Sequence, residues 1–117
     1  MLSLPASVSI FVHTRPTDLR KSFDGLCGLV RSDFGRDPVD GSLYLFLNAR
    51  RDRVKLLWWD HDGLVIWYKR LEAGTFESLR RGGEAASVQI DATELSLLLG
   101  GISMASAQRR KRYRKAG

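Results

Sequence analysis

Arginine, lysine and aromatic side chains crowd together between residues 50 and 70, and this mixture suits binding to nucleic acid. Cations can contact phosphates while aromatic rings stack on bases. The same residue types are also favoured at the centres of protein–protein interfaces. The candidate binding residues are Arg50, Arg51, Arg53, Lys55, Trp59, Tyr68 and Arg70.

A second concentration of positive charge lies near the carboxyl terminus. Six of the 19 basic residues fall within seven positions there, and without them 13 basic residues balance 13 acidic ones. The net charge of +6 therefore belongs to this tail, which indicates an acidic partner such as DNA. A solubilising terminus is the alternative. The candidate tail contacts to DNA are Arg109, Arg110, Lys111, Arg112, Arg114 and Lys115.

Residues that could catalyse a reaction are sparse. His13 and His61 are the only histidines, and the chain lacks a Gly-rich phosphate loop, a cysteine pair and a Gly-x-Ser-x-Gly motif. The Asp-His-Asp cluster at 60–62 is better explained as a turn than as a metal site, because neighbouring side chains point in different directions. No carboxylates converge as a two-metal nuclease requires. We therefore expect a binding protein with no catalytic residue, no metal and no cofactor, not an enzyme.

The helices that would support these residues differ in length. The longer one is predicted between about residues 18 and 34, with Thr17 at its N-cap, because apolar residues recur there at helical spacing. A short second helix is predicted after Asp91 and Glu94, whose spacing suits a capping box. The apolar stripe of the long helix comprises Leu19, Phe23, Leu26, Cys27, Val30 and Phe34.

Strands account for most of the remaining chain. The fold class expected is α+β: an antiparallel β-meander with one long amphipathic helix packed on one face and a short C-terminal helix. Residues 1–104 should form a single domain, and residues 105–117 a flexible basic tail. The predicted strands are 7–13, 42–48, 53–60, 64–71 and 86–90.

The hairpin between residues 53 and 71 decides which side chains share a face. A two-residue turn at 62–63 would place Trp59 opposite Ile66, whereas a four-residue turn would place it opposite Leu64. Both registers give the same two faces, since strand side chains alternate. We expect the long helix to cover the apolar face that holds Trp58. The face with Trp59 and the cations would then stay open for a partner, unless the minor helix or a loop covers it.

The chain shows no sign of a membrane or secretory role. No apolar run approaches the roughly 20 residues that a membrane span needs, and the first residues lack a secretory pattern. The single cysteine, Cys27, cannot form an internal disulfide. We therefore expect a cytoplasmic protein with no membrane partner, located at the nucleoid if DNA is its ligand.

Two motifs resemble one family of mobile-element proteins. The segment 50–60, RRDRVKLLWWD, resembles the hallmark of the TnpB accessory proteins (the second open reading frame) of the IS66 insertion-sequence family. The segment 17–26, TDLRKSFDGL, resembles the first motif of the same family. The likeness spans about residues 5–104 and leaves the basic tail outside. The departures from the family pattern are Leu19, Ser22, Ala49 and Gly100.

This resemblance implies an accessory role in transposition beside a separate, larger transposase that carries the acidic catalytic residues. The protein would bind the DNA of the element, the transposase or both, and the family supplies no catalytic residue to transfer. A small metal-dependent nuclease is one alternative, which metal-dependent cleavage of a plasmid would reveal. A protein-only interaction adaptor is the other, and it would lack salt-dependent retention on DNA.

The basic tail leads to a first prediction. Deleting residues 108–117 should strongly flatten the dependence of DNA affinity on salt, because each phosphate contact contributes about −0.9 to the slope of log K against log salt. Titration of labelled DNA at several salt concentrations measures this slope. An unchanged slope in the truncated protein would mean that the tail is only a solubilising terminus.

Overall fold

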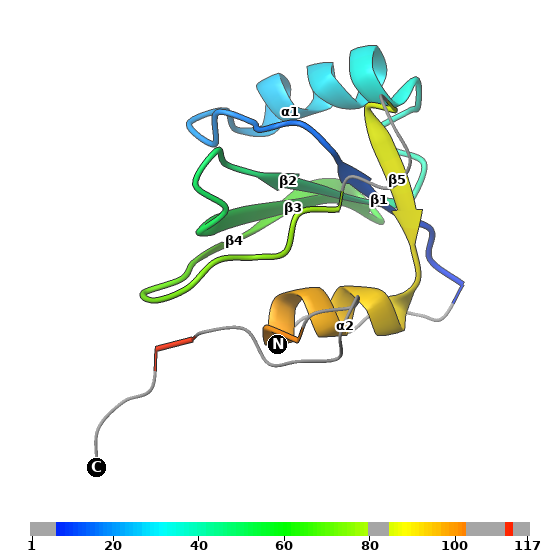
Figure 1. Cartoon of the computed structure of the whole chain (residues 1–117). Helices are drawn as coiled ribbons and strands as arrows, with labels where there is room; N and C mark the ends of the chain where they lie inside the picture. The colour runs from blue at the N-terminus through cyan, green and yellow to red at the C-terminus, as the bar shows by residue number, and fades with distance from the viewer. Residues whose placement is uncertain (1–6, 80–84, 103–111, 114–117) are drawn as a thin grey trace.

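A five-stranded sheet lies between two helical layers in the computed structural model, which describes residues 7–79, 85–102 and 112–113 (Figure 1). One helix crosses above the sheet in this view and the other lies below it. The elements in chain order are β1 (Ile10–His13), α1 (Phe23–Leu29), the π-helical turn η1 (Val30–Phe34), β2 (Leu43–Leu47), β3 (Arg53–Asp60), β4 (Gly63–Arg70), β5 (Ser87–Ile90) and α2 (Ala92–Gly100).

The sheet is mixed, with the strand order β4-β3-β2-β1-β5. The pairs β2–β3, β3–β4 and β1–β5 are antiparallel, whereas β1 and β2 pair in parallel. The expected antiparallel meander is therefore wrong as a description of the fold. A parallel pair requires a crossover of a dozen or more residues, and residues 14–42 provide it by carrying α1 across the sheet.

The expected long helix from 18 to 34 is also wrong. Helical structure covers only residues 23–34, as seven α-helical residues followed by five π-helical ones. Residues 14–22 instead form a loop against the sheet, where the Thr17 N–H donates to the Leu47 carbonyl at 2.8 Å. Leu19 is buried from this loop rather than from a helix. The apolar spacing predicted burial correctly at Leu19, but the contact with β2 overrides the helical continuation.

The second helix begins as its sequence indicates. The Asp91 side chain accepts from the Glu94 N–H at 2.7 Å, and the Glu94 side chain accepts from the Asp91 N–H at 3.2 Å, which completes the predicted capping box. Leu95 and Leu98 are buried against the sheet, and Gly101 ends α2 with a φ of 80°. None of the helices in the described part of the chain is long and apolar enough to cross a bilayer.

Both faces of the sheet are covered. Leu26, Cys27 and Val30 pack from α1 and η1 onto the face that carries Tyr44, Phe46 and Leu57. Helix α2 and residues 71–79 cover the opposite face. The longer helix therefore packs on the face of Leu57, Lys55 and Trp59, contrary to expectation. The reason is that Leu57, Leu64 and Ile66 make the part of this face near the helix apolar enough to bury.

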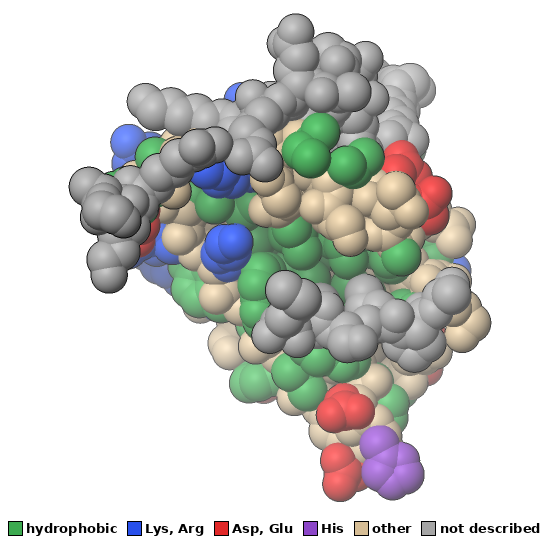
Figure 2. All heavy atoms as spheres, turned by 90° about the horizontal axis from the view of Figure 1, so that it is seen from below, with side chains coloured by type: hydrophobic (Ala, Val, Ile, Leu, Met, Phe, Trp, Pro, Cys, Tyr) green, Lys and Arg blue, Asp and Glu red, His purple; other side chains and the backbone are tan. Residues whose placement is uncertain are grey.

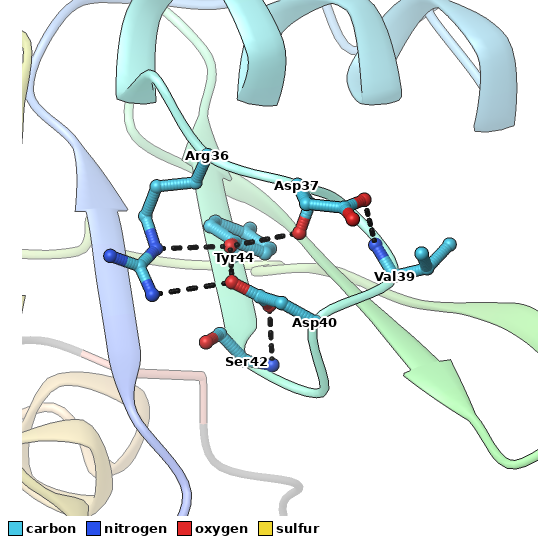
Figure 3. A network of polar contacts seen from close by, with 6 residues as sticks. All are labelled: Arg36, Asp37, Val39, Asp40, Ser42 and Tyr44. Carbon is cyan, nitrogen blue, oxygen red and sulfur yellow. Dashed lines mark hydrogen bonds and ion pairs between the residues drawn. The ribbon is translucent and has the colours of Figure 1, made fainter.

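A polar network closes the loop between η1 and β2 (Figure 3). The buried Tyr44 hydroxyl donates to the Asp40 carboxylate at 2.8 Å and accepts from Arg36 Nε at 3.3 Å. Arg36 also contacts the Asp40 carboxylate at 3.2 Å and lies over the Phe11 ring. Burial alone would raise the pKa of Asp40, but hydrogen bonds from the Ser42 N–H and from Tyr44 outweigh it and hold that pKa below its ordinary value.

Replacing Tyr44 with phenylalanine should lower the free energy of unfolding by about 0.5–1.5 kcal/mol, since the partly exposed Asp40 carboxylate loses its hydroxyl donor while the ring packing is retained. Urea denaturation with an unchanged m-value measures the loss. A stability equal to that of the wild type would show that water replaces the hydroxyl at no cost.

Candidate nucleic-acid interface

Two adjoining pockets open at the end of the sheet where β1 and β2 finish and β3 begins. The larger has a volume of about 470 Å³ and the smaller about 280 Å³. Both are built from the loop after β1 and the turn between β2 and β3, and they share Pro16, Asn48 and Ala49. Tyr68 of β4 completes the larger pocket, and Ser78 and Leu79 complete the smaller one.

Positive charge dominates the lining of these pockets. Five arginines and two aspartates, Asp18 and Asp52, line them, and we call this region the arginine end of the sheet. Figure 2 shows Lys and Arg side chains gathered on the left of the α2 face, the side on which the same loops lie in Figure 1. The arginines are Arg15, Arg20, Arg50, Arg51 and Arg53.

The two aspartates are already engaged. Asp18 forms an ion pair with Arg20 at 2.6 Å, and hydrogen bonds from Arg20 lower the pKa of Asp18 to about 2. Asp52 accepts from the Asn48 amide at 2.6 Å. By contrast, Arg50 and Arg53 form no ion pair with a carboxylate within the described ranges. The arginine end therefore presents cations that are available to an external anion.

Asn48 organises the turn that carries Arg50, Arg51 and Arg53. Its side-chain oxygen accepts from the backbone N–H groups of Asp52 at 3.1 Å and Arg53 at 3.0 Å, and its backbone carbonyl accepts from the Arg51 N–H at 3.0 Å. Asparagine side chains commonly complete turns in this way. The arginines are consequently held on a fixed loop.

The same turn contains a strained residue. Arg51 has a φ of 55°, a left-handed conformation that costs a non-glycine residue about 1–2 kcal/mol. Two backbone hydrogen bonds hold the turn in place, from the Phe76 N–H to the Arg51 carbonyl and from the Leu71 N–H to the Asp52 carbonyl, both at 2.7 Å. These bonds and the hydrogen bonds of Asn48 hold Arg51 in this conformation.

Tyr68 is fixed by two cations. Arg53 donates to its hydroxyl at 3.2 Å, and Lys55 Nζ lies 4.7 Å from the centre of its ring. Lys55 itself is only 8% exposed and donates to the Lys21 carbonyl at 2.8 Å, so it links β3 to the residues just before α1. Lys55 thus supports Tyr68 from inside the protein rather than presenting a charge to solvent.

Arg53 and Arg70 lie directly opposite each other on β3 and β4. Like charges at opposed positions destabilise a sheet, and Arg70 relieves part of this repulsion through an ion pair with Glu72 at 2.9 Å. Arg53 has the Tyr68 hydroxyl as its hydrogen-bond partner. An anion bound near Arg53 would remove the remaining repulsion.

The structure separates one predicted residue from the others. Arg50, Arg53 and Tyr68 line the larger pocket, Arg51 lines the smaller one, and Arg70 lies at the same end of the sheet. Trp59 pairs with Leu64, as the longer of the two turns predicts, and the pairing with Ile66 is wrong. Trp59 is half-buried near the hairpin, about 20 Å along the strand from Arg53.

Of the predicted tail contacts, only Arg112 lies within the described residues. Its guanidinium donates to the Thr75 carbonyl at 3.0 Å and lies 5.2 Å from the centre of the Phe76 ring. This arginine therefore packs on the domain. The other predicted tail contacts, Arg109, Arg110, Lys111, Arg114 and Lys115, lie outside the described residues.

Sequence reasoning missed Thr17 and Asn48. Thr17 was expected to cap a helix, but it lines the larger pocket, is 5% exposed and has a hydroxyl without a hydrogen-bond partner among the described residues. Asn48 directly follows an apolar strand, and a turn-forming residue in that place was a usable signal.

His13 joins β1 to η1 beside the smaller pocket. Its Nε2 lies 2.7 Å from the Asp33 carboxylate and its Nδ1 lies 2.8 Å from the Arg15 carbonyl, while the rings of Phe34 and Phe46 flank it. Both ring nitrogens are thus engaged within the protein, which indicates a structural role. No group of three or more metal-binding side chains occurs in the part of the chain that the structure describes.

Comparison with known proteins gives one family and two relatives. Residues 8–109 match the family model described as IS66 Orf2 like protein. Two proteins of Sinorhizobium fredii (strain NBRC 101917 / NGR234) are similar: "Uncharacterized protein y4hO" is 31% identical over all of both chains, and "Uncharacterized protein y4jC" is 30% identical over 94% of this chain and 92% of its own length. No solved structure matches.

The His13–Asp33 contact makes the stability of the fold depend on pH in the acidic range. The hydrogen bond with His13 lowers the pKa of Asp33 below its ordinary value of 3.8, so its stabilisation is present above that value and is lost as the pH falls below it. Replacing Asp33 with asparagine should flatten this part of the pH profile, measured by urea denaturation between about pH 5 and pH 2. Asp24→Asn on α1 is the matched control. Equal profiles for the Asp33 variant and the wild type would contradict the assignment.

Proposed function

We propose that this chain, which belongs to the IS66 Orf2-like protein family, is a non-catalytic accessory protein of transposition that contacts DNA through its arginine end. The family associates the chain with IS66 transposition. The finer role, contact with DNA and with the separate transposase in the bacterial cytoplasm, is our proposal.

The observation that carries the DNA part of the proposal is the surplus of arginines over aspartates around the two pockets. Arginine matches phosphate geometry well because its guanidinium offers several donors in one plane. Arg50 and Arg53 come from one turn whose backbone is held by hydrogen bonds, so little backbone entropy is lost there when a ligand binds. Phosphate contacts of this kind give affinity and orientation without selecting a base sequence.

The hairpin end of the sheet supports contact with the transposase instead. Trp59 lies there next to the exposed acidic turn that contains Asp60 and Asp62. The two carboxylates would repel DNA, whereas a half-buried tryptophan beside them suits a protein partner. We therefore assign the predicted residue Trp59 to a protein contact, separate from the DNA contact at the arginine end.

Duplex DNA binding tests the proposal. The double variant Arg50→Ala, Arg53→Ala should bind a labelled duplex more weakly, and its slope of log K against log salt should be about 1.8 units shallower, since each phosphate contact contributes about 0.9. Arg31→Ala is the control for charge, because Arg31 is exposed on η1 and lines neither pocket. Equal slopes for the double variant and the wild type would refute a DNA contact at the arginine end, and metal-dependent cleavage of the duplex would refute the non-catalytic role.

The background for this measurement is a protein whose tail has been neutralised. Arg109, Arg110, Lys111, Arg114 and Lys115 are changed to glutamine, while Arg112 is kept because it donates to the Thr75 carbonyl and contacts Phe76. This background separates the arginine end from tail contacts, which would otherwise mask it.

A further inference from the structure

We infer that the larger pocket at the arginine end accepts one unpaired nucleotide of single-stranded DNA, with its base against Tyr68 and its phosphate at Arg50 and Arg53. This inference rests on the proposed function and deepens it, because it names the form of DNA that the site takes. The backbone of the same DNA strand would then continue into the smaller pocket, which adjoins the larger one at Pro16, Asn48 and Ala49.

The size of the pocket favours an unpaired base over a duplex. A volume of about 470 Å³ falls in the range of roughly 300–1,000 Å³ typical of pockets that enclose small organic ligands. A base within a duplex is paired and stacked, so it can enter such a pocket only after leaving the helix, at an energetic cost that single strands do not pay. A duplex would therefore contact the rim alone.

Tyr68 has the properties of a stacking platform. It is 47% exposed, lines the pocket and is held by Arg53 at its hydroxyl. Lys55 Nζ occupies one face of the ring at 4.7 Å, which leaves the opposite face for a base. Because both cations hold the ring before binding, little side-chain entropy is lost when a base stacks on it.

The remaining lining supplies polar contacts of the right kind. Arg50 and Arg53 lack carboxylate partners among the described residues, while the aspartates of the lining, Asp18 and Asp52, are bonded to Arg20 and Asn48. Thr17 also lines the pocket, but its hydroxyl is enclosed by the protein, so the polar contacts assigned to the nucleotide are those of Arg50 and Arg53.

Fluorescence anisotropy on the tail-neutralised protein tests the inference. The probes are a labelled oligothymidine of 12 nucleotides and a duplex of equal length. Tyr68→Ala should weaken single-strand binding by about 5- to 150-fold, the equivalent of the roughly 1–3 kcal/mol that one stacked base contributes, with little change in duplex binding. Tyr68→Phe should retain most of the single-strand affinity because its ring can still stack. Phe23→Ala, which removes an exposed aromatic ring outside the pocket, is the matched control and should change nothing.

One further measurement sharpens the test. Thymidine monophosphate should compete only at concentrations far above that of the strand. Competition at equal concentration would identify a free nucleotide as the ligand and overturn the strand assignment.

The outcomes separate this inference from the proposed function. Single-strand binding that survives Tyr68→Ala, together with duplex binding that depends on Arg50 and Arg53, would overturn the nucleotide pocket and leave the proposed function standing. Failure to bind either form of DNA would overturn both. Unfolding midpoints of the variants by urea denaturation show that each protein tested is folded.

Discussion

The fold depends on burying β2 from both sides. All five residues of Leu43–Leu47 are buried, with alternate side chains in two separate hydrophobic clusters. A strand that is apolar on both faces requires a covering layer above and below, and it requires paired strands on both edges. Strands β1 and β3 pair with β2 on its two sides. Helix α1 with η1 forms the layer on one face, and α2 with residues 71–79 forms the layer on the other. The loop that brings α1 across the sheet also delivers Thr17 to the end of β2, which is how the arginine end acquires its second wall.

Local patterns were sufficient to predict the elements but not their arrangement. The strand runs and the capping box at Asp91 and Glu94 were readable, because each depends on neighbours in sequence. The hairpin was narrowed to two registers, and only the structure selects the one that places Trp59 opposite Leu64. The parallel pairing of β1 with β2 depends on residues more than 30 positions apart, which periodicity cannot reveal. The helix was overextended because Leu19 is apolar at helical spacing, although it is buried from a loop. The face of Lys55 was expected to stay open because it mixes cations with aromatic side chains, but its part near α1 is apolar and Lys55 itself is buried.

The candidate site was predicted in part for the same reason. Arg53 and Tyr68 could be grouped from sequence because they share a face of one hairpin, and Arg50 because it lies in the loop that leads into β3. The structure brings all three to one pocket. Trp59 was grouped with them because side-chain alternation reports the face of a strand and is silent about distance along it. Thr17 could not be included without knowing that the loop after β1 folds back on β2. The role of Lys55 also emerges only in three dimensions, where its amine joins the Lys21 carbonyl to the Tyr68 ring.

The opposed arginines on β3 and β4 have a consequence for how this protein responds to its surroundings. Dissolved ions screen the repulsion between Arg53 and Arg70, so added salt should stabilise the hairpin of the free protein. If DNA binds at the arginine end as proposed, the same ions would compete with its phosphates and weaken the complex. Ionic strength would then stabilise the free protein and destabilise its complex, and a bound phosphate would relieve the repulsion between the two arginines. A mutation that pairs Arg53 with a carboxylate would raise the stability of the free protein and lower any affinity of the arginine end for nucleic acid.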